Sequence, residues 1–171
     1  VTVALGGDGG DELFGGYDRY LPHPRVARFD ALTGSAGRAV AGATWPLVPH
    51  GVQGRNFLRH VAQGPRDRYL DSIRLLQPDE MRALLSADFG KAIDLDRIGT
   101  SARERFGRLG ALPWASQMMH FDIDTYLPED ILTKVDRMSM AHSIESRVPL
   151  LDHNVVTFAA SLPHDMKIRH G

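Results

Sequence analysis

The chain opens with Val1-Thr2-Val3-Ala4-Leu5-Gly6-Gly7-Asp8-Gly9-Gly10-Asp11-Glu12, an apolar, β-branched run followed by a glycine-rich acidic turn. The first five residues predict a short buried strand that ends at the two glycines. Acids near Asp11 suit the positive end of a helix dipole, so we expect a helix to begin there. Ligands of open α/β sheets bind beyond the carboxyl ends of strands, which makes this turn a candidate site.

The turn carries three carboxylates, those of Asp8, Asp11 and Glu12, within five positions. Its glycines let a ligand approach the backbone closely and point amides at it. Carboxylates repel a phosphate unless a cation lies between them, and Mg²⁺ bridges carboxylates to phosphates with oxygen ligands at roughly 2.1 Å. The pattern therefore predicts a magnesium–nucleotide site. A polar turn that leads into an acid-capped helix is the alternative that the residues themselves leave open.

Other nucleotide, metal and nucleophile motifs do not fit the sequence. A dinucleotide-binding G-x-G-x-x-G from Gly7 fails at Glu12, and a Walker A loop from Gly10 lacks its lysine. A calcium loop from Asp8 fails at Gly10. The chain has no cysteine, which excludes a disulfide framework, thiol catalysis and thiolate metal sites.

Composition indicates a globular chain of 171 residues with a net charge of −1. This near-neutral balance gives no general attraction to nucleic acid or to acidic membranes. No apolar run approaches the ~20 residues that span a bilayer, and no basic leader precedes the first strand, so we expect a cytoplasmic protein. Residues 19–66 contain seven arginines and one acid. This basic segment is either a solvated face or a surface that meets a phosphate or an acidic domain.

The rest of the chain predicts short helices and no second strand. We expect a helix from Pro78 that stops at residues 87–90, another through Trp114, and another from Pro128. A final helix is expected at residues 152–161, with Asp152 as its cap and Val155, Val156, Phe158 and Ala159 facing inward. Residues 144–152 look irregular. There, Glu145 and Arg147 either form a buried ion pair that fixes the loop or bind a ligand.

Two stretches resemble the synthetase domain of glutamine-hydrolysing asparagine synthetases. Residues 5–20 read Leu-Gly-Gly-Asp-Gly-Gly-Asp-Glu-Leu-Phe-Gly-Gly-Tyr-Asp-Arg-Tyr, which is similar to the family pattern S-G-[ED]-G-[SG]-D-E-x-F-G-G-Y. Residues 126–153, from Tyr-Leu-Pro through Glu-Ser-Arg-Val-Pro-Leu-Leu-Asp-His, resemble a later block of the same domain. The two blocks occur in the family's order, which makes the resemblance specific.

The resemblance implies a fold and a reaction. Residues 1–171 would be part of a single synthetase domain, as a mainly α fragment with one short N-terminal strand in an α/β adenine-nucleotide α-hydrolase-like domain. ATP would adenylate the side-chain carboxylate of aspartate, and ammonia made from glutamine in a glutaminase domain would attack β-aspartyl-AMP to give asparagine. Mg²⁺ would neutralise charge at the phosphorus centre. A homodimer is an open possibility.

The resemblance also assigns residues. Asp11 matches the magnesium-binding aspartate, and Asp8 matches the acid needed for adenylation and ammonia attack. Gly6 and Gly7 match the dipeptide that contacts ATP. The later block places Glu145 and Arg147 near the substrate pocket.

Departures from the family pattern keep alternatives open. Gly6 replaces a common serine and Asp8 a common glutamate, so an amidotransferase or ligase acting on another carboxylate is the second hypothesis. A non-catalytic helical interaction module is the third. The family's pyrophosphate loop S-G-G-x-D-S and its glutaminase domain do not occur in these 171 residues, and its catalytic lysine would follow Gly171. We therefore expect this chain alone to lack synthetase activity.

Overall fold

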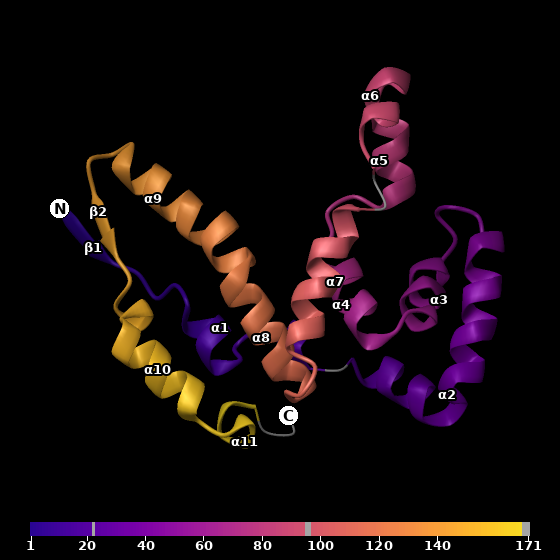
Figure 1. The fold of residues 1–171 in the computed structure, drawn as a ribbon, viewed down its shortest axis with the longest axis horizontal. Helices are drawn as coiled ribbons and strands as arrows, with labels where there is room; N and C mark the ends of the chain where they lie inside the picture. Colours follow the sequence, from indigo (N-terminus) through magenta and orange to yellow (C-terminus); the bar gives the residue numbers. More distant parts are fainter. Residues whose placement is uncertain (22, 95–96, 169–171) are drawn as a thin grey trace. The chain divides into compact units, whose positions relative to one another are not determined.

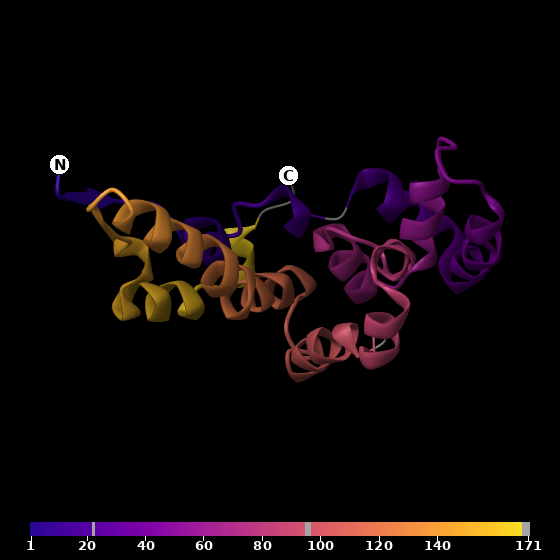
Figure 2. The same cartoon turned by 90° about the horizontal axis from the view of Figure 1, so that it is seen from above.

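The computed structural model describes residues 1–21, 23–94 and 97–168. The chain divides into two compact units (Figures 1 and 2). The terminal unit comprises Val1–Leu21 and Leu109–Gly171, and the central unit comprises Pro22–Arg108. Both are mainly helical, and one pair of strands occurs in the described part of the chain, so the predicted mainly α character is confirmed.

The terminal unit joins the two ends of the sequence. Its elements are β1 (Val3–Leu5), α1 (Gly10–Phe14), η1 (Asp18–Tyr20), α8 (Trp114–Asp124), a π-helical segment η3 (Leu127–Leu132), α9 (Thr133–Met140), β2 (Glu145–Arg147), η4 (Pro149–Leu151), α10 (His153–Ser161) and α11 (His164–Lys167). In Figure 1, α8 and α9 form one long orange arm, and β2 returns from its far end to lie beside β1. Asp152 caps α10 by accepting a hydrogen bond from Asn154 N, as predicted.

The strand pair corrects two predictions. β2 forms within the stretch expected to be irregular, and it pairs in parallel with β1, with Leu5 opposite Arg147. β1 is exposed rather than buried: Val3 is 38% and Leu5 76% exposed. The reason is that charged β2 is the one strand that pairs with β1 in the described chain, and no apolar layer covers either strand.

The core of the terminal unit lies between α1 and α8. Leu13 of α1 and Met118, Met119 and Phe121 of α8 are all buried. The spacing predicted a helix through Trp114, Met118 and Phe121, and this is confirmed. Phe158 of α10 was expected to face inward but is 60% exposed, whereas its neighbour Ala159 is fully buried. α10 therefore turns a narrower apolar face inward than its sequence suggests.

The central unit is entirely helical within the residues described. Its elements are α2 (Pro24–Thr44), η2 (Trp45–Leu47), α3 (Arg55–Ala62), α4 (Pro65–Ile73), α5 (Pro78–Leu84), α6 (Ala87–Ala92) and α7 (Ile98–Arg108). The helix from Pro78 is confirmed, but α6 occupies the predicted stop. There, Ser86 caps α6 by accepting a hydrogen bond from Phe89 N, which offsets the poor helix propensity of Gly90.

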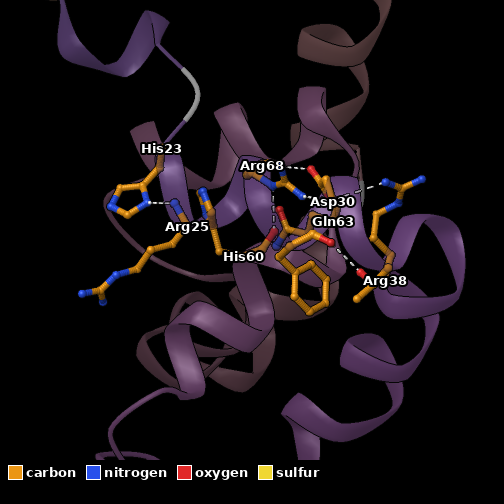
Figure 3. A network of polar contacts seen from close by, with 9 residues as sticks. His23, Arg25, Asp30, Arg38, His60, Gln63 and Arg68 are labelled. Atoms are coloured by element: carbon orange, nitrogen blue, oxygen red, sulfur yellow. Dashed lines mark hydrogen bonds and ion pairs between the residues drawn. The ribbon is translucent and has the colours of Figure 1, made fainter. Parts of the chain in front are cut away.

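Two contacts hold the central unit together. Val26 and Ala41 of α2 pack against Val61 of α3, and α2 bends at Gly34, where φ is +56°. Asp30 of α2 accepts a hydrogen bond from Arg68 Nη1 of α4 at 2.8 Å (Figure 3). The hydrogen bond from Arg68, against a smaller effect of burial, holds the pKa of the Asp30 carboxyl below its usual value. No helix among the described residues is long and apolar enough to cross a membrane.

Candidate active site

Backbone hydrogen bonds bring the two stretches singled out by sequence together in the terminal unit. Gly6 N donates to Arg147 O at 2.8 Å, and Glu145 N donates to Thr2 O at 2.8 Å. The acidic turn therefore starts where the parallel strand pair ends. The sequence does not indicate this pairing, because Glu145, Ser146 and Arg147 are charged or polar and give no strand signal of their own.

The glycines of the turn serve two different purposes. Gly9 has φ +87°, and a side chain there would overlap Leu151, while a Cβ on Gly10 would lie 3.0 Å from Leu150 Cδ1. These two glycines therefore allow the turn to pack on η4, a packing role that the sequence did not indicate. A Cβ on Gly7, in contrast, would meet no atom within 4 Å. The backbone at Gly7 faces open space, as the predicted approach of a ligand requires.

Two of the three carboxylates are available at the turn. Asp8 is half-buried, and its Oδ2 lies 2.6 Å from the position of a Cβ on Gly6, so the carboxylate folds back over Gly6. Asp11 lies in the first turn of α1, exposed, with its carboxylate against Gly16. Neither Asp8 nor Asp11 forms an ion pair with a described cation. The described residues contain no cluster of three or more metal-ligating side chains.

Glu12 does not join this site. It is 1% exposed and accepts a hydrogen bond from the Tyr17 hydroxyl at 2.9 Å. Burial, together with this bond to Glu12, raises the pKa of the Tyr17 hydroxyl far above its usual value, so the hydroxyl remains a donor. Of the three carboxylates of the acidic turn, those of Asp8 and Asp11 are therefore accessible, whereas that of Glu12 is buried and bonded to Tyr17.

A second buried contact, which we call the Asp122 cluster (Arg19, Tyr20 and Asp122), also supports the turn. Asp122 is fully buried and accepts hydrogen bonds from Arg19 Nη2 and from the Tyr20 hydroxyl, each at 2.7 Å. The Arg19 guanidinium lies 4.2 Å from the ring centroid of Tyr17 and 4.6 Å from that of Tyr126. The cluster ties the segment after α1 to α8. The sequence does not indicate the Asp122 cluster, because Asp122 lies about a hundred residues after Arg19 and Tyr20.

Glu145 and Arg147 form the expected ion pair, but not a buried one. Arg147 Nε donates to Glu145 Oε1 at 2.7 Å, and both side chains are more than half exposed. The hydrogen bond from Arg147 holds the pKa of the Glu145 carboxyl below its usual value. The pair lies on β2, on one side of the strand, and is accessible to a ligand.

Other features of the terminal unit lie apart from this turn. On α9, Lys134 Nζ donates a hydrogen bond to Asp130 Oδ2 at 2.7 Å. A cavity of about 390 Å³ is lined by residues of α1, α8, α10 and α11 and of the loops beside them, most of which are apolar. Glu12 reaches this cavity, whereas Asp8 and Asp11 do not line it, so the cavity is not the predicted nucleotide site.

Comparisons with known proteins show what the chain is similar to. A family model described as asparagine synthase matches residues 1–171. The chain is 29% identical over 171 residues to asparagine synthetase (glutamine-hydrolyzing) 1 of Bacillus subtilis, covering 100% of this chain and 26% of that protein. It is 22% identical over 187 residues to the amidase chry2 of Gibberella zeae, covering 99% of this chain and 27% of that protein. The chain thus spans about a quarter of the length of these curated relatives. No solved structure shows significant similarity to it.

Proposed function

The chain belongs to the asparagine synthase family, and we propose that both units are part of one ATP-dependent synthetase domain of the adenine-nucleotide α-hydrolase type. In the proposed reaction, a side-chain carboxylate oxygen of aspartate bonds to the α-phosphorus of ATP, and pyrophosphate leaves. Ammonia released from glutamine by a glutaminase domain then bonds to the acyl carbon of β-aspartyl-AMP. AMP leaves, a proton is lost and asparagine forms. The proposed location is the cytoplasm.

One observation carries this proposal. At the carboxyl end of β1, Asp8 and Asp11 present carboxylates without a described cationic partner, beside open space at Gly7. Unpaired carboxylates at a turn are unfavourable for binding a bare phosphate and favourable for binding a metal-bound one. The same turn is bonded through Gly6 N to the strand that bears Glu145 and Arg147. The acidic turn therefore follows the end of β1 that lies beside Arg147 of β2.

Asp11 fits the role of a magnesium ligand. It is exposed and offers hard oxygen donors, and Mg²⁺ commonly takes one or two protein carboxylates together with phosphate oxygens and water. The terminal unit carries twelve acids against six lysines and arginines, so its charge opposes a free triphosphate. Mg²⁺, when bound, supplies charge neutralisation at the phosphates. Holding that cation is the part of the reaction we assign to Asp11.

The remaining residues bind and orient the substrates. Gly6 and Gly7 let the nucleotide approach the backbone. To Asp8, whose carboxylate folds back over Gly6, we assign the role of accepting the proton that ammonia loses after it attacks the acyl carbon. The exposed Glu145 carboxylate and Arg147 guanidinium complement the α-ammonium and α-carboxylate of an amino acid.

The identity of the products tests the proposal. The intact protein, given aspartate, glutamine, ATP and Mg²⁺, should form asparagine, AMP and pyrophosphate in equal amounts, measured by mass spectrometry. Asp8→Asn and Asp11→Ala should each lose this activity, whereas Asp18→Ala should keep it, because Asp18 is an exposed acid outside the turn. Formation of ADP instead of AMP would contradict the proposed adenylation.

A ligase or amidotransferase acting on another carboxylate is the second candidate. The match to an amidase over 99% of the chain favours it, as does the shorter Asp8 in place of the family's common glutamate. AMP formation that requires a carboxylate other than aspartate would support this candidate. An intact protein that binds no ATP would instead favour a non-catalytic helical module.

A further inference from the structure

The central unit contains a cleft of about 870 Å³, well separated in sequence from the acidic turn. Trp45, the loop of residues 50–54, α3 and the segment from Asp71 to Arg82 supply its walls. Its volume lies within the range of small-molecule sites, roughly 300–1,000 Å³. We call it the arginine cleft, because four arginines line it: Arg55, Arg59, Arg74 and Arg82.

The two carboxylates of the arginine cleft are already engaged. Asp71 Oδ2 lies 3.4 Å from Arg59 Nη2, and Glu80 Oε2 accepts a hydrogen bond from Gln77 N at 2.7 Å. Asp30, the one acid within the basic segment of residues 19–66, pairs with Arg68 and Arg38 outside the cleft (Figure 3). Among the described residues, neither of the two acids of the cleft pairs with Arg55 or Arg74.

Arg55 is the unusual member of the set. It is only 9% exposed, and none of its described contacts is a carboxylate: its Nε donates to Val48 O at 2.9 Å, its Nη2 lies 3.3 Å from His50 Nε2, and its Cζ lies 5.0 Å from the ring of Trp45. Among the described residues, no carboxylate pairs with it. A buried guanidinium without a counter-charge is costly, and an anion in the cleft would remove that cost.

The position of Arg55 at the start of a helix increases the energetic cost of its buried charge. It is the first residue of α3, where the helix dipole adds positive potential instead of offsetting the charge of a cation. Gly54, which precedes it at φ +95°, offers no side chain to cap the helix. Arg74, which also lines the cleft, makes no ion pair with a described residue. Two cations without a described carboxylate partner therefore line the cleft.

The net charge of the central unit also favours an anionic ligand. It carries fourteen lysines and arginines against nine acids, a net charge of +5 within a chain whose net charge is −1. A positive unit attracts small anions, and its cleft contains Arg55 and Arg74, neither of which forms an ion pair with a described residue.

We propose that the arginine cleft binds a small organic oxyanion through the buried Arg55 and through Arg74, which also lines the cleft. Arginine recognises phosphates and carboxylates through the same planar fork, so a phosphate ester and a polycarboxylate share the required chemistry. The site is independent of the proposed synthetase function, because none of its lining residues belongs to the terminal unit.

Calorimetric titration of the intact protein tests the site. Tripolyphosphate and citrate are titrated separately at low ionic strength. All proteins carry Asp11→Ala and EDTA is present, so that metal-dependent binding at the acidic turn does not contribute. We expect at least one of them to bind, and Arg74→Gln to weaken that binding about tenfold. Arg28→Gln removes one exposed charge from the same unit outside the cleft and should change the affinity less than twofold. Binding of tripolyphosphate alone assigns a phosphate ester, and binding of citrate alone a polycarboxylate.

Thermal unfolding provides a second readout. The anion that binds should raise the unfolding temperature of the parent protein and of Arg28→Gln, but not that of Arg55→Met. Absence of binding by both anions would overturn the proposal. Equal affinities for the Arg74→Gln and Arg28→Gln variants would also overturn it, because the attraction would then be a property of the whole unit. If Arg55→Met does not fold, the titration of Arg74→Gln decides.

Discussion

Replacement of Asp122 by alanine should destabilise the terminal unit by about 2–4 kcal/mol. Asp122 is fully buried and accepts hydrogen bonds from Arg19 and Tyr20, each at 2.7 Å. A hydrogen bond to a charged group contributes about 1.5–3 kcal/mol, and both bonds end on the Asp122 carboxylate. The Arg19 side chain is 26% exposed, so water replaces part of its lost partner and the upper end of the range is reduced.

Urea denaturation followed by tryptophan fluorescence measures this effect. The chain has two tryptophans, and Trp45→Phe leaves Trp114, at the start of α8, to report on the terminal unit. Asp122→Asn keeps one acceptor oxygen and should lose less stability than Asp122→Ala. Asp136→Ala removes an exposed acid from α9 and should stay within about 0.5 kcal/mol of the parent. If Asp122→Ala matched Asp136→Ala, the cluster would not hold η1 to α8.

Two further predictions concern pH and the glycines of the turn. Because Arg68 lowers the pKa of Asp30, this pair stabilises the folded state above the usual pKa of 3.8, and the contribution is lost as pH falls through the lowered value. Asp30→Asn should therefore reduce stability at neutral pH and flatten its decline in acid, as measured by urea midpoints; an unchanged acid slope would count against the pair. Gly9→Ala should destabilise the protein by at least about 1–2 kcal/mol, because φ is +87° and Leu151 fills the space. Gly7→Ala, with open space around it, should leave the melting temperature unchanged and weaken ATP binding. If Gly7→Ala were destabilising and Gly9→Ala were not, the packing role of Gly9 and the ligand-facing role of Gly7 would both be refuted.

Local sequence signals predicted several elements correctly. The apolar run before Gly6 gave β1, the acids near Asp11 marked α1, and Asp152 marked the start of α10. In each case the signal and the structure it predicts lie within a few residues of one another.

Features that depend on distant partners could not be predicted. Glu145-Ser146-Arg147 is polar and short, and it becomes a strand only because β1 lies beside it. Glu12 is buried and accepts a hydrogen bond from the Tyr17 hydroxyl, and its position in the sequence beside two accessible acids does not reveal this burial. Arg55 likewise gives no signal in the sequence beyond one more basic residue.

Magnesium-dependent ATP binding tests the central claim most directly. We predict that the intact protein binds ATP in calorimetric titration with Mg²⁺ and loses at least about tenfold in affinity when EDTA replaces the metal or when Asp11 is changed to alanine. Asp18→Ala should bind ATP as the parent does. ATP binding that is equally tight in EDTA, or that is unaffected by Asp11→Ala, would contradict the assignment of the acidic turn as the metal–nucleotide site.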